Sequence, residues 1–402
     1  MTVSSTLPLS ALLSQILVAF TLELDNEFER EIGNAGHPGA RLSLVLWSNL
    51  IRFVPREGIS VRELAKHALL EEKQIKFMLG CLERWRFITV EPGAKPDERP
   101  KKLLKNGLAV RDGWGSARGI GADWVVKLTQ TRGAKAKEIW APLTGIIEAR
   151  WRSRFGNEEI QQLRDALKSI VGQVDVELPH GFTDIRYRKR PFPARREREG
   201  ADLPLPTLLS QALLAFAIDF EGESRAPFAL CASTIRVLGE KPTRESEIPR
   251  LTGSSPETSG VGWQIKPYII VEPDPGARRG KVIRLSPRGL LAQNNYRRVT
   301  AEIEKRWESR FGRENVLQLR ESLQALIGAE KADHLLLSEG LVPGAGTIRA
   351  GDVAPALGRR DVGAAAKQRA RDLVAQTAEF VRDPAASLPH YPLWDMNRGF
   401  GP

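Results

Sequence analysis

The stretch LPLSALLSQILVAF at residues 7–20 returns in the middle of the chain as LPLPTLLSQALLAF at residues 203–216. Ten of these fourteen positions are identical. Two more blocks recur in the same order, residues 87–92 as 268–273 and residues 150–156 as 306–312. Three collinear matches over so long a spacing predict two copies of one domain rather than a short-period solenoid.

The repeated block also argues against a secretion signal. Residues 7–20 are apolar, but no Lys or Arg precedes them. The run is shorter than the roughly 20 apolar residues that span a bilayer. Because the same block recurs deep inside the chain, we expect it to belong to the folded core of a soluble, cytoplasmic protein with no membrane segment.

Composition narrows the class of protein. The 402 residues allow two or three domains of ordinary size. With 42% hydrophobic and 27% charged residues, the chain is not collagen-like, fully disordered or membrane-embedded. The two cysteines, Cys81 and Cys231, form no CxxC motif, which is typical of a reducing compartment. A net charge of +11 favours a polyanionic partner.

Each copy begins and ends with an apolar stripe at helical spacing. The opening stripe of the first copy is Leu9, Leu12, Leu13, Ile16, Leu17 and Phe20; the closing stripes are Ile160, Leu163, Leu167 and Ile170, and Val316, Leu319, Leu323 and Leu326. These stripes are too long to cover one small lobe. We therefore expect the two copies to bury them against each other.

Between the end helices, each copy carries the pattern of a helix-turn-helix followed by a hairpin. Ser60 with Glu63 three residues later forms a capping box. A break at residues 67–70 precedes a second helix at about 71–84. β-rich runs follow on either side of a polar segment, at residues 87–90 and 124–128 and again at 268–271 and 281–285.

The prediction is a mainly α fold with small β-hairpin wings, in which two winged helix-turn-helix domains form an intrachain pseudo-dimer. The expected boundaries are 1–176 for the first domain, 177–201 for a basic Pro/Arg linker, 202–330 for the second domain and 331–402 for a tail with one helix at 363–381. The linker is either a spacer or a clamp for phosphate. Leu388-Pro389-His390 in the tail echoes Leu178-Pro179-His180 after the first copy, which indicates that the tail docks on the body.

This ordered set of elements resembles the MarR-type winged-helix regulators. The post-wing signature Leu-Thr/Ser-x-x-Gly stands at residues 285–289 and, with one extra residue, at 128–133. The resemblance covers about residues 7–170 and 203–327, as a tandem version of a family usually found as homodimers. It implies a transcription regulator of double-stranded DNA, with recognition helices in the major groove, wings along the backbone and a small-molecule effector between the lobes.

Four groups of residues are candidate DNA contacts, because Lys and Arg bind phosphate or guanine and Gln reads adenine. They are Lys73, Gln74 and Lys76 in the first recognition helix; Lys95, Arg99, Lys101, Lys102 and Lys105 in the first wing; Ser254, Ser255 and Thr258 in the second recognition segment; and Arg278, Arg279 and Lys281 in the second wing.

Another interpretation stays open for both recognition segments. Glu71 and Glu72 suit the positive end of a helix dipole and would repel phosphate, so this face can simply be solvated. Glycines within residues 252–263 weaken a second recognition helix. That helix is either stunted or ordered only on DNA.

Motifs for catalysis are missing from the sequence. The five histidines have no metal-ligand spacing, and there is no HExxH, GxSxG or GxxxxGK[ST]. We therefore expect no enzyme, no metal and no cofactor. The leading hypothesis is a DNA-binding transcriptional regulator, and the alternative is a winged-helix interaction or scaffold protein without sequence-specific DNA binding.

Overall fold

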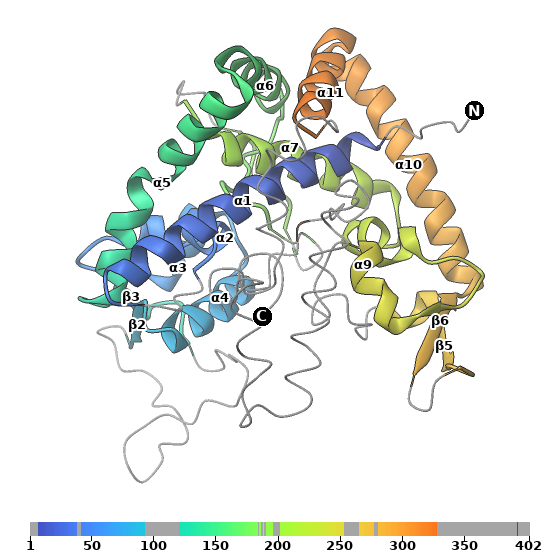
Figure 1. The fold of residues 1–402 in the computed structure, drawn as a ribbon. Coiled ribbons are helices and arrows are strands. Elements are labelled where there is room, and N and C mark those ends of the chain that lie inside the picture. The colour runs from blue at the N-terminus through green and yellow to red at the C-terminus, as the bar shows by residue number, and fades with distance from the viewer. Residues whose placement is uncertain are drawn as a thin grey trace.

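The computed structural model describes residues 7–37, 42–92, 120–183, 185, 188, 190–195, 202–252, 265–276, 280–327 and 392. Within these residues the chain is mainly helical and carries two small antiparallel sheets (Figure 1). The helix expected at 363–381 lies outside the described residues.

The described residues of the first half form ten elements before the linker. They are α1 (Leu9–Asn34), α2 (Leu44–Asn49), the 3-10 turn η1 (Ile51–Phe53), β1 (Ile59–Ser60), α3 (Val61–Ala68), α4 (Glu72–Arg84), β2 (Ile88–Glu91), β3 (Val125–Leu128), α5 (Arg132–Phe155) and α6 (Asn157–Val171).

The second half repeats this order where it is described. Its elements are α7 (Leu205–Glu223), α8 (Phe228–Leu230), the π-helical turn η2 (Cys231–Ile235), β4 (Thr243–Arg244), the 3-10 turn η3 (Glu245–Glu247), α9 (Ile248–Thr252), the 3-10 turn η4 (Lys266–Tyr268), β5 (Ile269–Pro273), β6 (Lys281–Leu285), α10 (Pro287–Phe311) and α11 (Arg313–Ile327). Residues 253–264, which would match α4, lie outside the described part.

Both sheets have three strands with the last strand in the middle. The strand orders are β1-β3-β2 and β4-β6-β5, and every pair is antiparallel. In each sheet a two-residue strand, β1 or β4, holds the loop before the short helices against the central strand of the hairpin. The hairpin is therefore tied to the helices that precede it.

Each sheet is joined to the following long helix by a glycine that no other residue could replace without movement. A Cβ on Gly133 would lie 2.0 Å from the Phe87 carbonyl oxygen, and a Cβ on Gly289 would lie 2.0 Å from that of Tyr268. These are the glycines of the Leu-Thr/Ser-x-x-Gly signature. The signature thus marks the place where the helix start presses on the backbone that leads into the hairpin.

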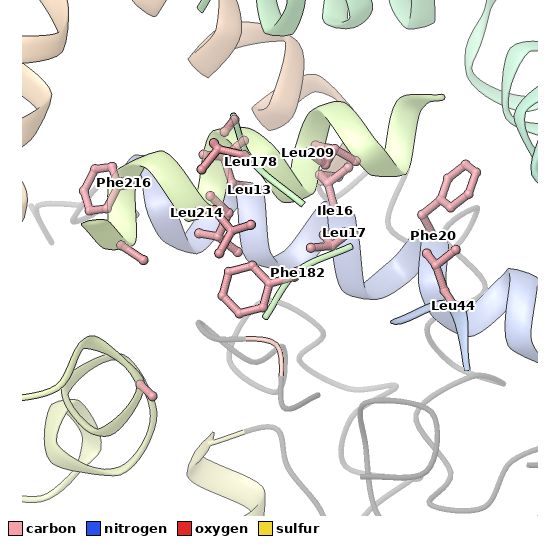
Figure 2. Close-up of a cluster of buried hydrophobic side chains, with 14 of the residues drawn as sticks. Leu13, Ile16, Leu17, Phe20, Leu44, Leu178, Phe182, Leu209, Leu214 and Phe216 are labelled. Carbon is pink, nitrogen blue, oxygen red and sulfur yellow. The ribbon is translucent and has the colours of Figure 1, made fainter. Parts of the chain in front are cut away.

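The centre of the molecule is the contact between α1 and α7, the two copies of the repeated block. α6 packs against α11 in the same region, and Figure 1 shows both pairs above the sheets. α1 is long and apolar enough to cross a membrane, but 94% of its most apolar window is buried inside the molecule. Side chains from both halves meet in the cluster of Figure 2, including Leu13, Ile16 and Leu209.

Each first helix is also anchored within its own half by a tryptophan. The Trp151 indole nitrogen donates to Glu23 at 2.9 Å, and Trp307 donates to Asp219 at 2.8 Å. Because each indole has a hydrogen-bond acceptor, these large side chains can be buried without an unsatisfied N–H.

The start of α7 is capped by a side chain from the first half. Its N-cap is Pro204, which makes no side-chain cap. Instead, Glu148 on α5 accepts from the Leu205 N–H at 3.4 Å and from Arg164 on α6 at 2.6 Å. Arg164 donates in turn to the Leu203 carbonyl at 2.9 Å. The orphan N–H and the positive helix end thus meet a carboxylate.

The start of α1 is capped in the same way by the second half. Glu304 on α10 accepts from the Leu9 N–H at 2.6 Å and from Arg320 on α11 at 2.6 Å. Arg320 donates to the Leu7 carbonyl at 2.8 Å. We call these two sets of contacts the crossed Glu–Arg clasps, because each half caps the first helix of the other.

The clasps differ in burial, which allows a test. Arg164→Met should remove the buried one of the two guanidinium partners of Glu148, leave the carboxylate with Arg152 at 2.9 Å and lower the free energy of unfolding by about 3 kcal/mol. Arg320→Met should cost only about 1–2 kcal/mol, because the Arg320 and Glu304 side chains are 20% and 22% exposed. Urea unfolding followed by circular dichroism measures both values. Equal losses, or no loss at Arg164, would contradict the structural importance of the buried clasp.

Candidate nucleic-acid interface

The short helices α3 and α4 are set by local sequence. The Ser60 hydroxyl accepts from the Glu63 N–H at 3.1 Å, so the predicted N-cap of α3 is confirmed. Leu69 ends α3 in the left-handed region at φ 55°. A new helix then begins at Glu72, as the break in the sequence pattern predicted.

α4 has an apolar inner face and a basic outer face. Ile75, Met78, Leu79 and Leu82 are buried against the rest of the first half. Lys73 and Arg84 are exposed, Lys76 is half-buried and Phe77 is 41% exposed. These four follow one another at the spacing of a single helix face. α4 therefore presents two lysines, an arginine and an aromatic ring along one side.

Gln74, a candidate for reading adenine, is turned inward. It is 6% exposed, and its side-chain oxygen accepts from the Glu71 N–H at 3.2 Å. Its amide nitrogen donates to the Thr183 hydroxyl at 3.3 Å. Both ends of the side chain are therefore used inside the protein, and the free chain does not present Gln74 to solvent. Lys76 forms an ion pair with Glu72 at 3.4 Å.

The linker lies across the start of α4. Arg188 donates to the Leu69 carbonyl at 2.7 Å, and its guanidinium carbon lies 3.5 Å from the centre of the Phe192 ring. The Arg190 N–H donates to Glu71 at 3.4 Å. Burial lowers the pKa of Arg188, while the Glu71 charge opposes this effect. The linker is thus an ordered part of this surface where it is described, and it brings positive charge beside Glu71.

Of the predicted contacts in the second wing, Lys281 is described. Lys281 lies at the start of β6, is exposed and has no ion pair with any described residue. Ten predicted contacts fall outside the described residues: Lys95, Arg99, Lys101, Lys102 and Lys105; Ser254, Ser255 and Thr258; and Arg278 and Arg279.

The two hairpins lie on one side of the molecule. In Figure 1, β2 and β3 stand at the lower left and β5 and β6 at the lower right, away from α6 and α11 at the top. α4 lies on the same lower side, between them. A partner that touched both hairpins would therefore also pass the region of α4.

Phe77, Arg84 and Arg188 also lie on this surface, although they are not among the predicted contacts. For Phe77 and Arg84 a signal was available, because they continue the helix face that begins at Lys73. For Arg188 there was none, since its contact with Leu69 spans 119 residues and depends on the path of the linker.

A hollow of about 810 Å³ opens on the first half, not between the halves. It is lined by the end of α1, by the end of β3 and by the start of α5, with His37, Arg56 and Lys135 among its residues. Lys137 on the same wall donates to the Val54 carbonyl at 2.6 Å, and burial lowers its pKa. Against these cations the lining carries one carboxylate, Glu138, which pairs with Lys135 at 2.9 Å, so its net charge stays positive and suits an anionic small molecule.

The described residues form no cluster of three or more His, Cys, Asp or Glu side chains that could hold a metal ion. Cys81 and Cys231 are free, and burial raises the pKa of both thiols. These features offer no activated nucleophile at either position.

No family model, curated protein or solved structure matches this chain.

The linker contains a titratable group that reports on its docking. Burial and, second, the Arg52 charge lower the pKa of His180 from its ordinary value of 6.5 to about 4. The neighbouring Gly181 N–H donates to Asn49 at 3.0 Å, which fixes the segment on the first half.

Stability should therefore fall as the pH falls from 6.5 to 4, because the unfolded state takes up a proton at residue 180 that the folded state excludes. The loss should reach about 3 kcal/mol. His180→Gln should flatten this part of the profile. Denaturant unfolding at several pH values gives the free energy of unfolding of both chains. Subtracting one profile from the other removes the contributions of the carboxylates, which the two chains share. Identical profiles for the two chains would show that residue 180 is solvated.

Proposed function

We propose that the chain is a DNA-binding transcriptional regulator of the MarR-like winged-helix type, in tandem form. The observation that carries the proposal is the order strand, helix, turn, helix and hairpin, with both hairpins on one side of the body. α4 would be the recognition helix of the first half. The hairpins would be the wings, and the two halves would form a pseudo-dimer in one chain.

Charge supports contact with phosphate. Lys73 and Lys76 lie on the outer face of α4, and Lys281 lies at the start of the second hairpin strand. The chain as a whole has a net charge of +11. A duplex that touched both hairpins would meet these cations, and each phosphate contact would release bound counterions.

Neighbouring groups reduce the repulsion that Glu71 and Glu72 would exert on DNA. Glu71 accepts from the Arg190 backbone N–H and interacts with the Arg188 charge, and Glu72 forms an ion pair with Lys76. The Arg188 and Lys76 charges thus partly offset those of the two carboxylates. The cost of bringing phosphate near the start of α4 is lower than the bare sequence suggests.

Regulation by a small anion is part of the proposal. The basic hollow between the end of α1 and the start of α5 adjoins β3, the central strand of the first sheet. An occupant there would contact the element that carries the first wing. As a regulator of this kind, the protein would be cytoplasmic and would have no catalytic function.

One observation favours a second candidate function, an interaction or scaffold protein without sequence-specific binding. Gln74 is buried under the linker, and Phe77 is the aromatic side chain that α4 exposes. An exposed ring beside lysines also suits a protein surface as partner. This alternative predicts no enrichment of any DNA sequence.

The deciding experiment measures binding of the full chain to a fluorescent random duplex as salt increases, followed by selection from a random-sequence pool. The regulator should bind more weakly by about 0.9 log units per phosphate contact for each log unit of salt, and selection should yield a motif. Binding without an enriched motif would favour the scaffold. No retention on DNA at low salt would exclude the regulator.

The second hairpin can be tested with a charge-matched pair of variants. Arg279→Ala with Lys281→Ala should flatten the salt slope by about 1.8, the value for two lost phosphate contacts. Lys305→Ala with Arg313→Ala removes the same charge from exposed positions near the turn between α10 and α11 and should leave the slope unchanged. Equal effects of the two variants would mean that DNA responds only to net charge.

A further inference from the structure

In the first half, the chain that follows α6 returns under the central helices. The Leu178 carbonyl accepts from the Gln211 side chain on α7 at 3.0 Å. Phe182, four residues later, is 1% exposed and belongs to the same buried cluster as Leu214 on α7 (Figure 2). Residues 178–182 thus cover a stripe of α7 by one amide hydrogen bond and one apolar contact region.

The matching stripe of α1 is buried but lacks these contacts. By the alignment of the repeated block, Gln15 corresponds to Gln211 and Val18 to Leu214. Gln15 is 0% exposed, and both atoms of its side-chain amide are without a hydrogen-bond partner in the described part of the chain. A buried amide without partners costs free energy, so this position calls for one.

The apolar part of the α1 stripe is separated from the core. Val18 and Leu22 are 1% and 4% exposed, yet they form a cluster of their own, apart from the cluster that includes the other central side chains. Gln15, Val18 and Leu22 share one helix face. Something other than the main hydrophobic core therefore shields this face of α1 from solvent.

The sequence supplies a segment of matching chemistry. Leu388-Pro389-His390 repeats Leu178-Pro179-His180, and in the same register Pro392 corresponds to Phe182. Pro392 is buried. The two positions that this register pairs are therefore both removed from solvent.

We propose that residues 388–392 of the C-terminal segment dock on the Gln15–Val18–Leu22 face of α1, as residues 178–182 dock on α7. A segment docked in this way would supply the partner that the Gln15 amide lacks and would set Pro392 on Val18. The C-terminal segment is thus an intramolecular strap on the first helix. This inference does not depend on DNA binding, and it holds for a scaffold as well.

Hydrogen–deuterium exchange of the full chain tests the strap, read by mass spectrometry at residues 385–395 and 176–184. In the unmodified chain both segments should exchange at least about tenfold more slowly than an unstructured peptide. Gln15→Leu should speed exchange at 385–395 about tenfold and leave 176–184 unchanged. Gln211→Leu is the matched control and should do the reverse.

A variant in the C-terminal segment tests the strap without altering α1 or α7. Leu388→Asp should release residues 385–395 in the same way, while far-UV circular dichroism shows that the helices persist. Exchange of the tail at the rate of a free peptide in the unmodified chain would overturn the strap. So would tail protection that neither Gln15→Leu nor Leu388→Asp changes.

Discussion

The crossed Glu–Arg clasps are the constraint on which the rest of the arrangement depends. Both first helices begin after a proline and form no side-chain cap of their own. Their N-terminal N–H groups are buried in the centre of the molecule, where water cannot satisfy them. Glu148 and Glu304 each serve the first helix of the other half. Neither half on its own therefore offers its first helix a complete environment.

The clasps also explain why the hairpins lie on one side. α5 and α10 carry the clasp glutamates near their far ends, and each follows directly on the central strand of a sheet. Gly133 and Gly289 hold the near ends of these helices on the backbone that leads into the hairpins. Each long helix thus acts as a rigid arm between the clasp and a hairpin. A change in one arm would move one hairpin relative to the other.

Local features of this fold could be predicted from the sequence. Ser60 caps α3 and the break after residue 67 falls at Leu69, because both depend on neighbouring residues. The inward turn of Gln74 could not be predicted, since its partner Thr183 is 109 residues away on the linker. The clasps could have been predicted from the repeat, because the alignment pairs Glu148 with Glu304 and Arg164 with Arg320. Identity between repeats at charged positions, outside any motif, points to a shared long-range contact.

The capping of α1 by Glu304 has a consequence for synthesis of the protein. The two bonded residues are 295 positions apart in the chain. At ribosomal rates of about 5–20 residues per second, roughly 15–60 s pass between the emergence of the two partners. During that interval the buried N-terminal N–H of α1 has no capping partner. Until translation delivers the second half, the nascent chain exposes apolar surface that favours aggregation.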